Sequence, residues 1–354
     1  MVIVADTHAN APAPTLNEQA AGVVKDAMAT GGRVTLIQVS GYPALTDLHL
    51  RDVQGTSAGK EAAMASNLTR IERALQKGTA TDGADDFEAI SRAADTLRDA
   101  KADRPAIVFT GSGLSDRGRL DFTAPGILTA SPEDVSTYLK RSNALPDLRG
   151  ITIYLSGIGY AAGPQEPLDA AQRANVTAIW RAVLQASGAE VIQSPDARTG
   201  PPVETSATVQ TVDVPTVATP AMCSTSEIVF GQQSAVSFIA EENRFVDAHV
   251  AGNALSPIAS WLAGDRSRTA VIRGTTADDR GDPERLKELG QSRADTVASY
   301  LIAHGADRAQ ISTIGVGAGF PEYVRPDIDP TTGLLLPGPA AMNRSVRIAL
   351  TDPC

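Results

Sequence analysis

The most restrictive feature of the sequence is a regular alternation of short β-branched runs with amphipathic helical segments from residue 2 to residue 194. The runs VIVAD, RVTLIQVS, PAIVFTGSG, GITIYLSGIG and EVIQS each have an apolar centre rich in Val, Ile or Leu, as is typical of strands covered on both faces. Repeated βα units of this kind predict an α/β domain, with a doubly wound, Rossmann-like, mostly parallel sheet between two helical layers.

A change of composition ends this series. Residues 196–222 are rich in Pro, Thr and Ser and lose helical periodicity, so we predict a linker between a domain of residues 1–195 and one of residues 223–354. The alternation in VETSATVQTVDV leaves open that part of this linker adds an edge strand to the first domain.

The second half carries a different order of elements. EIVFGQQSAVSF begins it, and a helix near 254–264, the strand TAVIRGTT, a long helix and two further strands follow. Asp282 at the N-cap, Pro283 at the first helical position and Gly305 after the end mark the bounds of the long helix. The order β-α-β-α-β-β predicts one mixed sheet with both helices on one face.

Arg293 lies in the middle of the apolar arc of this long helix, among Leu286, Leu289, Val297 and Leu301. A charge in such a place is costly unless a partner compensates it. The sequence therefore predicts a binding or ion-pairing role for Arg293.

Charge and hydropathy exclude several classes of partner. Asp and Glu number 41 against 31 Lys and Arg, and the net charge of −10 argues against nucleic acid or an anionic membrane. There is no apolar run of membrane-spanning length, and MVIVAD meets an aspartate too early for a signal peptide. Any membrane contact would come from a segment outside this sequence.

Cys223 and Cys354 are the only cysteines. They could form a disulfide, which would place the protein in an oxidising compartment, or remain two unrelated thiols.

Four motifs in order give residues 223–354 a resemblance to OmpA-like domains, the peptidoglycan-associating modules of bacterial envelope proteins. They are VIRGTTADD, LGQSRADTVASYL, ISTIGVGAGFP and NRSVRI. The resemblance implies that Cys223 and Cys354, which bracket the domain, come together as a disulfide. It also implies an extracytoplasmic location, with anchoring to a membrane through a missing N-terminal segment.

The resemblance implies a ligand as well, the diaminopimelate residue of the peptidoglycan peptide stem. Arg293 corresponds to the arginine that grips the ligand carboxylate. The aspartate that receives the ammonium maps to Asp278, fifteen residues before Arg293, although counting from the strand glycine gives Ala277; Asp279 is the fallback.

Two departures from the family pattern leave an alternative open. Leu286 and Gly290 stand where the family carries asparagine and serine. The fold could therefore have lost peptidoglycan binding and serve only as a protein-interaction scaffold, with Arg293 in a structural salt bridge.

The first half resembles a von Willebrand factor A-type domain, through Asp6 after the first strand, TDGADDFEAISRAADTL and ITIYLSGIGYAAG. The resemblance implies contacts with other envelope proteins and a divalent-cation site. Asp6-Thr7-His8-Ala9-Asn10 lacks both serines of the family's D-x-S-x-S, so we expect a degenerate, empty site at Asp6 and Thr81 and no cofactor.

The sequence gives little support for a dinucleotide site or a catalytic site. GIGYAAG at 157–163 has the glycine spacing of a dinucleotide loop, but Pro164 follows at once and no acidic residue ends a strand about 20 residues later. The four histidines are scattered and no catalytic constellation is present. The sequence predicts a non-enzymatic protein of the cell envelope.

Overall fold

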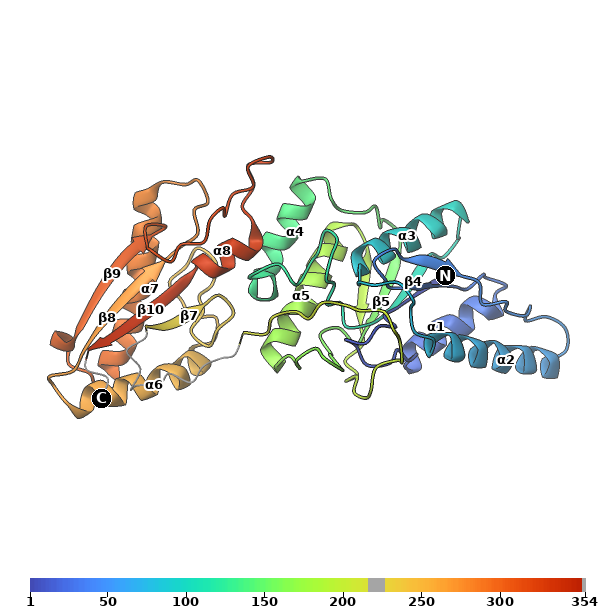
Figure 1. Cartoon of the computed structure of the whole chain (residues 1–354), viewed down its shortest axis with the longest axis horizontal. Coiled ribbons are helices and arrows are strands. Elements are labelled where there is room, and N and C mark those ends of the chain that lie inside the picture. The colour runs from blue at the N-terminus through green and yellow to red at the C-terminus, as the bar shows by residue number, and fades with distance from the viewer. Residues whose placement is uncertain (216–226, 352–354) are drawn as a thin grey trace. The chain divides into compact units, whose positions relative to one another are not determined.

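The computed structural model describes residues 1–215 and 227–351, which fall into two compact units (Figure 1). Unit 1 comprises residues 1–124 and 135–214, and unit 2 comprises residues 125–134 and 215–354. In the described residues, no helix is both long and apolar enough to cross a bilayer.

Unit 1 is built on a six-stranded sheet in the order β3-β2-β1-β4-β5-β6. Its strands are β1 (Val2–Ala5), β2 (Thr35–Gln38), β3 (Ala44–Thr46), β4 (Ala106–Thr110), β5 (Thr152–Ser156) and β6 (Glu190–Gln193). Every pair is parallel except β2 with β3. The helices are α1 (Glu18–Ala29), α2 (Ser57–Leu75), α3 (Asp86–Asp99), α4 (Pro132–Arg141) and α5 (Ala170–Ala186). The 3-10 turn η1 (Ile127–Thr129) and the first three residues of α4 belong to unit 2.

Helices cover both faces of this sheet. On one face Ile3 and Val108 pack with Val24 of α1 and Ile71 of α2 in one buried cluster. Phe109, next to Val108 and therefore on the opposite face, packs against the ring of Trp180 of α5 with 5.7 Å between centroids. The predicted layers on both faces are thus present in the structure.

The segment 196–214 differs from the predicted linker because it lies against unit 1. Val212 N–H donates to Gln165 Oε1 at 2.7 Å, and the carbonyl of Thr208 accepts from Gly83 N at 2.7 Å. These bonds run to separate loops, so the segment is extended without forming the edge strand that its alternation suggested. Of the predicted linker over 196–222, residues 196–214 thus belong to unit 1, and residues 216–222 lie outside the described residues.

Unit 2 has a four-stranded sheet in the order β7-β10-β8-β9. In chain order its elements are β7 (Ile228–Gly231), α6 (Ala248–Gly264), β8 (Thr269–Thr275), α7 (Pro283–Ala303), the 3-10 turn η2 (Arg308–Gln310), β9 (Ile311–Gly317), α8 (Pro337–Asn343) and β10 (Ser345–Thr351). β8 and β9 are parallel, and β10 is antiparallel to β7 and β8. Leu255 and Ile258 of α6 and Val297 of α7 pack on Ile272 and Ile348, so both long helices cover one face, as predicted.

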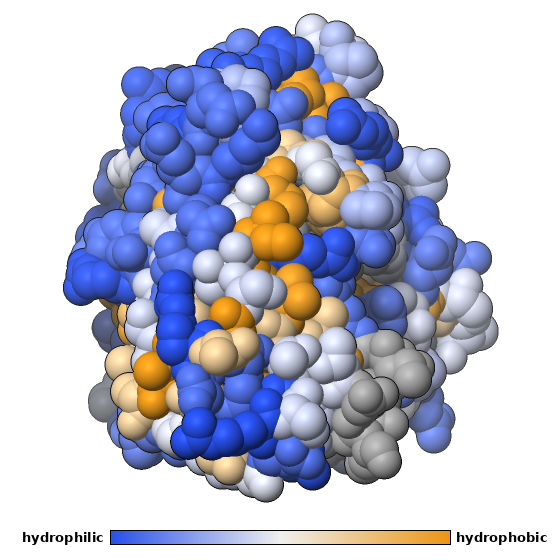
Figure 2. Space-filling model, turned by 90° about the vertical axis from the view of Figure 1, so that its left-hand side faces the viewer, coloured by the Kyte–Doolittle hydropathy of each residue, from blue (hydrophilic) through white to orange (hydrophobic). Residues whose placement is uncertain are grey.

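The opposite face of this sheet is partly apolar and open. Val229, Arg347, Arg273 and Ile314 are paired in register across the four strands. Val229 and Ile314 at the two ends of this row are 49% and 46% exposed, while Arg273 is held by Glu227 at 2.6 Å. Figure 2, seen from the side on which β9 lies in Figure 1, shows a band of apolar side chains between hydrophilic margins.

Helix α7 begins and ends where the sequence predicts. The Asp282 carboxylate accepts from the N–H of Glu284 at 3.0 Å, Pro283 occupies the first turn, and Gly305 after the C-cap has φ +108°. Its middle lies close to β8, where Gly290 and Gly274 meet backbone to backbone. This contact sets α7 over the end of β8, from which the candidate site is built.

Candidate functional site

Arg293 is held by the segment that precedes α6. Its Nε–H donates to the carbonyl of Glu242 at 2.9 Å and its Nη2 to the carbonyl of Ile239 at 3.4 Å. The guanidinium lies over the ring of Phe238, 5.4 Å from the centroid. The residue is only 8% exposed, yet it forms no ion pair within the part of the chain that the structure describes.

The Arg293 guanidinium keeps donors for a further partner. Arginine has five N–H groups, and the two bonds to Glu242 and Ile239 leave three. Burial lowers the pKa of Arg293 to about 10, with Glu241 favouring and Arg344 opposing its charge. Arg293 therefore remains a cation at neutral pH, partly withdrawn from water and without a carboxylate partner among the described residues.

The segment 237–246 forms a small hairpin-like turn around these two carbonyls. Ile239 N–H donates to the Arg244 carbonyl and Val246 N–H to the Ser237 carbonyl, both at 2.9 Å. The rings of Phe238 and Phe245 pack with centroids 5.1 Å apart. Sequence reasoning missed this turn, although two phenylalanines flanking a polar hexapeptide are a signal for it.

Asp278 follows β8 in a fixed backbone position. Its N–H donates to Tyr323 Oη at 2.7 Å and to Asp327 Oδ2 at 3.0 Å, and the Tyr323 hydroxyl in turn donates to Asp327. The Asp278 Oδ1 accepts from Arg280 N at 2.9 Å, while its Oδ2 has no bond to a described residue. Burial, together with the bond to Asp327, raises the pKa of Tyr323, so this hydroxyl stays a donor.

Asp279 is held in contacts within its own loop and with Arg285. Its Oδ1 accepts from Gly281 N at 2.8 Å, and its carboxylate pairs with Arg285. Arg285 also reaches Glu241 at 2.6 Å, so one guanidinium connects the loop after β8 with the 237–246 turn. Of the three predicted residues, Asp278 and Arg293 thus keep polar atoms that no described residue uses, whereas the carboxylate of Asp279 is already paired with Arg285. Ala277, the other aligned position, is buried and apolar.

The two departures from the family pattern have structural reasons. A side chain at Gly290 would collide with the carbonyl of Gly274, so the close approach of α7 and β8 requires glycine. Leu286 is 5% exposed and is part of the core. Neither position therefore offers a polar group to a ligand.

Asn343 and Arg344 begin the NRSVRI motif, and both contribute to the site although no site role was predicted for them. The fully buried Asn343 amide binds the backbone of Val324, accepting from its N–H at 2.8 Å and donating to its carbonyl at 3.0 Å. This fixes the loop that carries Tyr323 and Asp327. Arg344 pairs with Asp134 and lies close enough to Arg293 to oppose its protonation.

In unit 1 the carboxyl end of β1 carries a buried ion pair. His8 Nε2 contacts Asp6 Oδ1, and Asp6 Oδ2 accepts from the backbone N and the Oγ of Ser112 at 3.1 and 2.9 Å. Burial alone disfavours both charges, but their mutual attraction outweighs it, so the pKa of His8 is raised and that of Asp6 is lowered.

The predicted metal site does not fit a divalent cation. The imidazole of His8 contacts Asp6 Oδ1 and so blocks this oxygen from a cation, and Thr81 is exposed on the surface. Asp86, the nearest further acid, is fully buried, and burial reinforced by Asp6 raises its pKa to about 8. Within residues 1–215 and 227–351 no three His, Cys, Asp or Glu side chains are grouped as metal ligands.

The cysteines lie outside the described residues. Cys223 belongs to 216–226 and Cys354 to 352–354, so their disulfide stays a prediction.

Residues 248–327 of unit 2 match the OmpA family and form an OmpA-family domain. Over 69 residues the chain is 39% identical to the peptidoglycan-associated lipoprotein of Pasteurella multocida, covering 20% of this chain and 45% of the relative. It is 35% identical to the lipoprotein of the same name from Haemophilus influenzae, covering 20% and 44%. The matched segment thus spans less than half the length of these curated relatives.

Solved structures give similar matches. The peptidoglycan-associated lipoprotein from Burkholderia pseudomallei is 25% identical with a TM-score of 0.27, covering 33% of this chain and 88% of that one. The periplasmic domain of Helicobacter pylori MotB is 18% identical with a TM-score of 0.27, covering 35% and 81%.

Proposed function

We propose that the OmpA-family domain binds the diaminopimelate-containing peptide stem of peptidoglycan, with Arg293 gripping the carboxylate and Asp278 receiving the ammonium. The observation that carries this proposal is the environment of Arg293. A buried guanidinium anchored by two backbone carbonyls, with three N–H groups left over and no carboxylate partner among the described residues, is suited to an external carboxylate.

Asp278 suits the ammonium for a complementary reason. Tyr323 and Asp327 fix its backbone, and its Oδ2 is not used by a described residue. Asp279 is less suited because Arg285 already neutralises it. A site with one cationic and one anionic group binds a zwitterion in preference to ligands that carry only one of the two charges.

The relatives support a place in the cell envelope. Two curated relatives are named peptidoglycan-associated lipoproteins. The OmpA family match covers residues 248–327, which include Asp278 and Arg293. We infer an extracytoplasmic protein that is held to the wall by this domain.

Unit 1 is, in this proposal, a von Willebrand factor A-like domain that contacts other envelope proteins. Its strand order, with one antiparallel strand at the β3 edge, and the position of Asp6 after β1 support the assignment. Binding would not use a divalent cation, because His8 already compensates the charge of Asp6.

Cosedimentation with purified peptidoglycan tests the wall-binding proposal. We expect the wild type in the pellet, with Arg293→Lys and Asp278→Asn shifted to the supernatant. Arg308→Ala is the matched control, because this exposed arginine lies beyond the far end of α7 in η2. A wild type that stays in the supernatant, or an Arg293→Lys variant that pellets like the control, would overturn the proposal.

One observation favours a second function. Gly290 and Leu286 are used for packing, so the domain lacks two polar groups that help to hold a glycan peptide in the family. The second candidate is an interaction scaffold in which both domains bind proteins. The same sedimentation decides between the two, because a scaffold would leave the wild type in the supernatant.

A further inference from the structure

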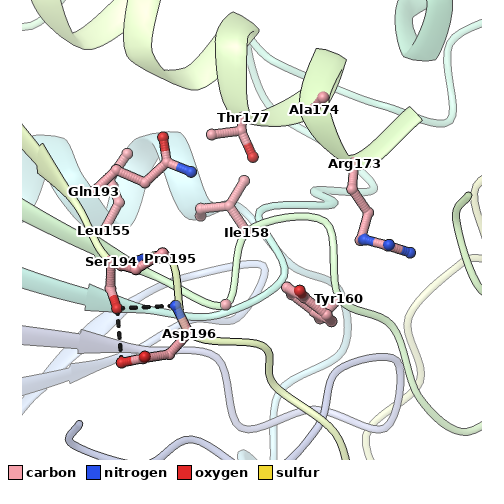
Figure 3. A pocket seen from close by; sticks show the side chains of 11 residues that line it. Leu155, Ile158, Tyr160, Arg173, Ala174, Thr177, Gln193, Ser194, Pro195 and Asp196 are labelled. Carbon is pink, nitrogen blue, oxygen red and sulfur yellow. Dashed lines mark hydrogen bonds between the residues drawn. The ribbon is translucent and has the colours of Figure 1, made fainter. Parts of the chain in front are cut away.

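Segment 196–214 crosses unit 1 at the carboxyl ends of its parallel strands. It starts just after β6, where Ser194 Oγ accepts from the N–H of Asp196 at 3.2 Å and donates to its carboxylate at 2.8 Å (Figure 3). The segment has no helix or strand and bonds to the loops after β1, β4 and β5 and to the loop before α3. Parallel α/β sheets bind ligands at this end of their strands. The segment therefore covers the surface where a partner of unit 1 is expected.

Three polar side chains of these loops hold the backbone of the segment. Asn10 Nδ2 donates to the carbonyl of Gln210 at 3.0 Å, and Asp116 Oδ2 accepts from the N–H of the same residue at 2.8 Å. Gln165 Oε1 accepts from the N–H of Val212 at 2.7 Å, and its Nε2 donates to the carbonyl of Val212 at 3.0 Å. All four bonds go to main-chain groups, which every polypeptide carries. The loops are therefore suited to an extended backbone.

Arg198 anchors the start of the segment at the end of the sheet. Its Nη2 lies within hydrogen-bonding distance of the Thr15 carbonyl, at 3.1 Å, and of the hydroxyls of Thr110 and Ser156, which end β4 and β5. The side chain is 7% exposed. Burial lowers the pKa of Arg198 to about 10, while the Asp6 carboxylate favours its charge. The strand ends thus form a fitted place for an arginine.

Small apolar side chains make the other contacts of the segment. Val203, Ala207 and Val212 are buried, and the residues on either side of each are exposed or half-buried. Gly78 shows how closely the segment lies on unit 1, because a Cβ there would be 2.4 Å from the carbonyl oxygen of Glu204. A larger residue at position 78 would push the segment away from the surface.

We propose, on the basis of the contact role given to unit 1, that segment 196–214 is an internal occupant of a peptide-binding surface. The external partner of this surface is an extended polypeptide segment that carries an arginine and small apolar side chains. The surface is closed while the chain's own segment lies on it, because a covalently attached segment has a high effective concentration. A partner binds when this segment leaves.

Binding of a separate peptide tests the proposal. The probe is a fluorescent peptide of residues 196–214, titrated into the full chain and followed by anisotropy. Arg198→Gln/Val203→Ser, the anchor variant, removes two buried contacts of the attached segment, and Thr199→Ala/Ser206→Ala is the matched control at two exposed positions. We expect the anchor variant to bind the peptide at least about tenfold more tightly than the wild type, because its surface is open more often. The control should bind as the wild type does.

A second peptide tests the arginine. The same peptide with Arg198→Gln should bind the anchor variant at least about tenfold more weakly than the unaltered peptide. Equal binding of the two peptides would overturn the assignment of the arginine anchor.

Amide exchange reports release of the segment directly. The N–H groups of Thr208, Gln210 and Val212, which bond to side chains of unit 1, should exchange faster in the anchor variant, while those of β1 and β4 stay protected. Gly78→Ala should have the same effect with every anchor in place, and Gly22→Ala, where a Cβ meets nothing within 4 Å, is its control.

Three results would overturn the proposal: no peptide binding by an anchor variant whose β1 and β4 stay protected, equal peptide binding by the anchor variant and the wild type, or unchanged exchange of the segment in Gly78→Ala. These measurements involve no envelope protein, so they decide whether the surface is occupied independently of the contact role of unit 1.

Discussion

The Nε–H of Arg293 donates a hydrogen bond of 2.9 Å to the backbone carbonyl of Glu242. The side chain that we assign to the ligand carboxylate therefore also holds the 237–246 turn against α7. Arg293→Ala should release this turn as well as remove the cation. The two effects can be separated because lysine keeps the charge and loses the planar, forked geometry.

We predict that Arg293→Ala destabilises the turn locally by about 1 to 3 kcal/mol, the usual loss for hydrogen bonds to a charged group. Amide exchange is the measurement: the N–H groups of Ile239 and Val246, which close the turn, should exchange faster. Arg308→Ala should leave both rates unchanged. Equal protection in Arg293→Ala would show that the turn does not depend on this arginine.

Gly290 offers a prediction on packing. Gly290→Ser restores the residue type of the family pattern but places atoms against the carbonyl of Gly274. We expect a loss of about 1 to 3 kcal/mol from overpacking, seen as a lower melting temperature of unit 2. Gly231→Ser is the control, since a Cβ there meets nothing within 4 Å. If Gly290→Ser were as stable as Gly231→Ser, contact with the Gly274 carbonyl would not explain the glycine at position 290.

Asp86 makes the stability of unit 1 depend on pH. Because its pKa is raised from 3.8 to about 8, the folded state holds a proton that the unfolded chain releases above pH 3.8. Stability should therefore fall as the pH rises from about 4 to about 8, and the raised pKa of His8 acts in the same direction above the usual histidine pKa of 6.5.

Denaturant unfolding at several pH values checks this. Asp86→Asn mimics the protonated acid, so it should flatten much of the dependence and exceed the wild type in stability at pH 8. An unchanged pH profile in this variant would mean that another group is responsible.

The His8 and Asp6 pair predicts how unit 1 responds to metal. An ion that binds only the folded state must raise its stability. We expect millimolar Mg²⁺ or Mn²⁺, and chelator, to leave the melting temperature of the wild type unchanged at constant ionic strength. His8→Ser, which frees the Asp6 carboxylate, is the comparison. A metal-dependent rise in the wild type would contradict the exclusion of the cation by His8.

Much of the fold could be predicted from local signals. The bounds of α7 follow from Asp282, Pro283 and Gly305, and α4 begins at Pro132 as its Ser-Pro start indicates. At α1 the spacing of Thr15 and Glu18 fits a capping box, but Asn17 is the N-cap, because its side chain accepts from Ala20 N at 2.8 Å. Two polar residues so close together compete for the cap, and sequence alone does not decide between them.

Elements stabilised by tertiary contacts were missed. The short strand β3 and the helix α8 lie in stretches rich in Pro and Gly or lacking periodicity, and such stretches favour a loop. Within the site, Arg293 and Asp278 follow from motif spacing. Tyr323, Asp327 and Asn343 could not be assigned, because their roles arise from loops that the fold alone brings to the end of β8.

The most direct test of the central claim is calorimetric titration of the full chain with a soluble peptide stem that ends in diaminopimelate, beside the same stem carrying lysine. Lysine lacks the second carboxylate, so Arg293 would lose its partner. We predict that the wild type binds the diaminopimelate stem. The affinity should be at least about tenfold lower when the stem carries lysine, or when the protein carries Arg293→Lys or Asp278→Asn. Equal binding of the two stems, or no binding of either by the wild type, would contradict it.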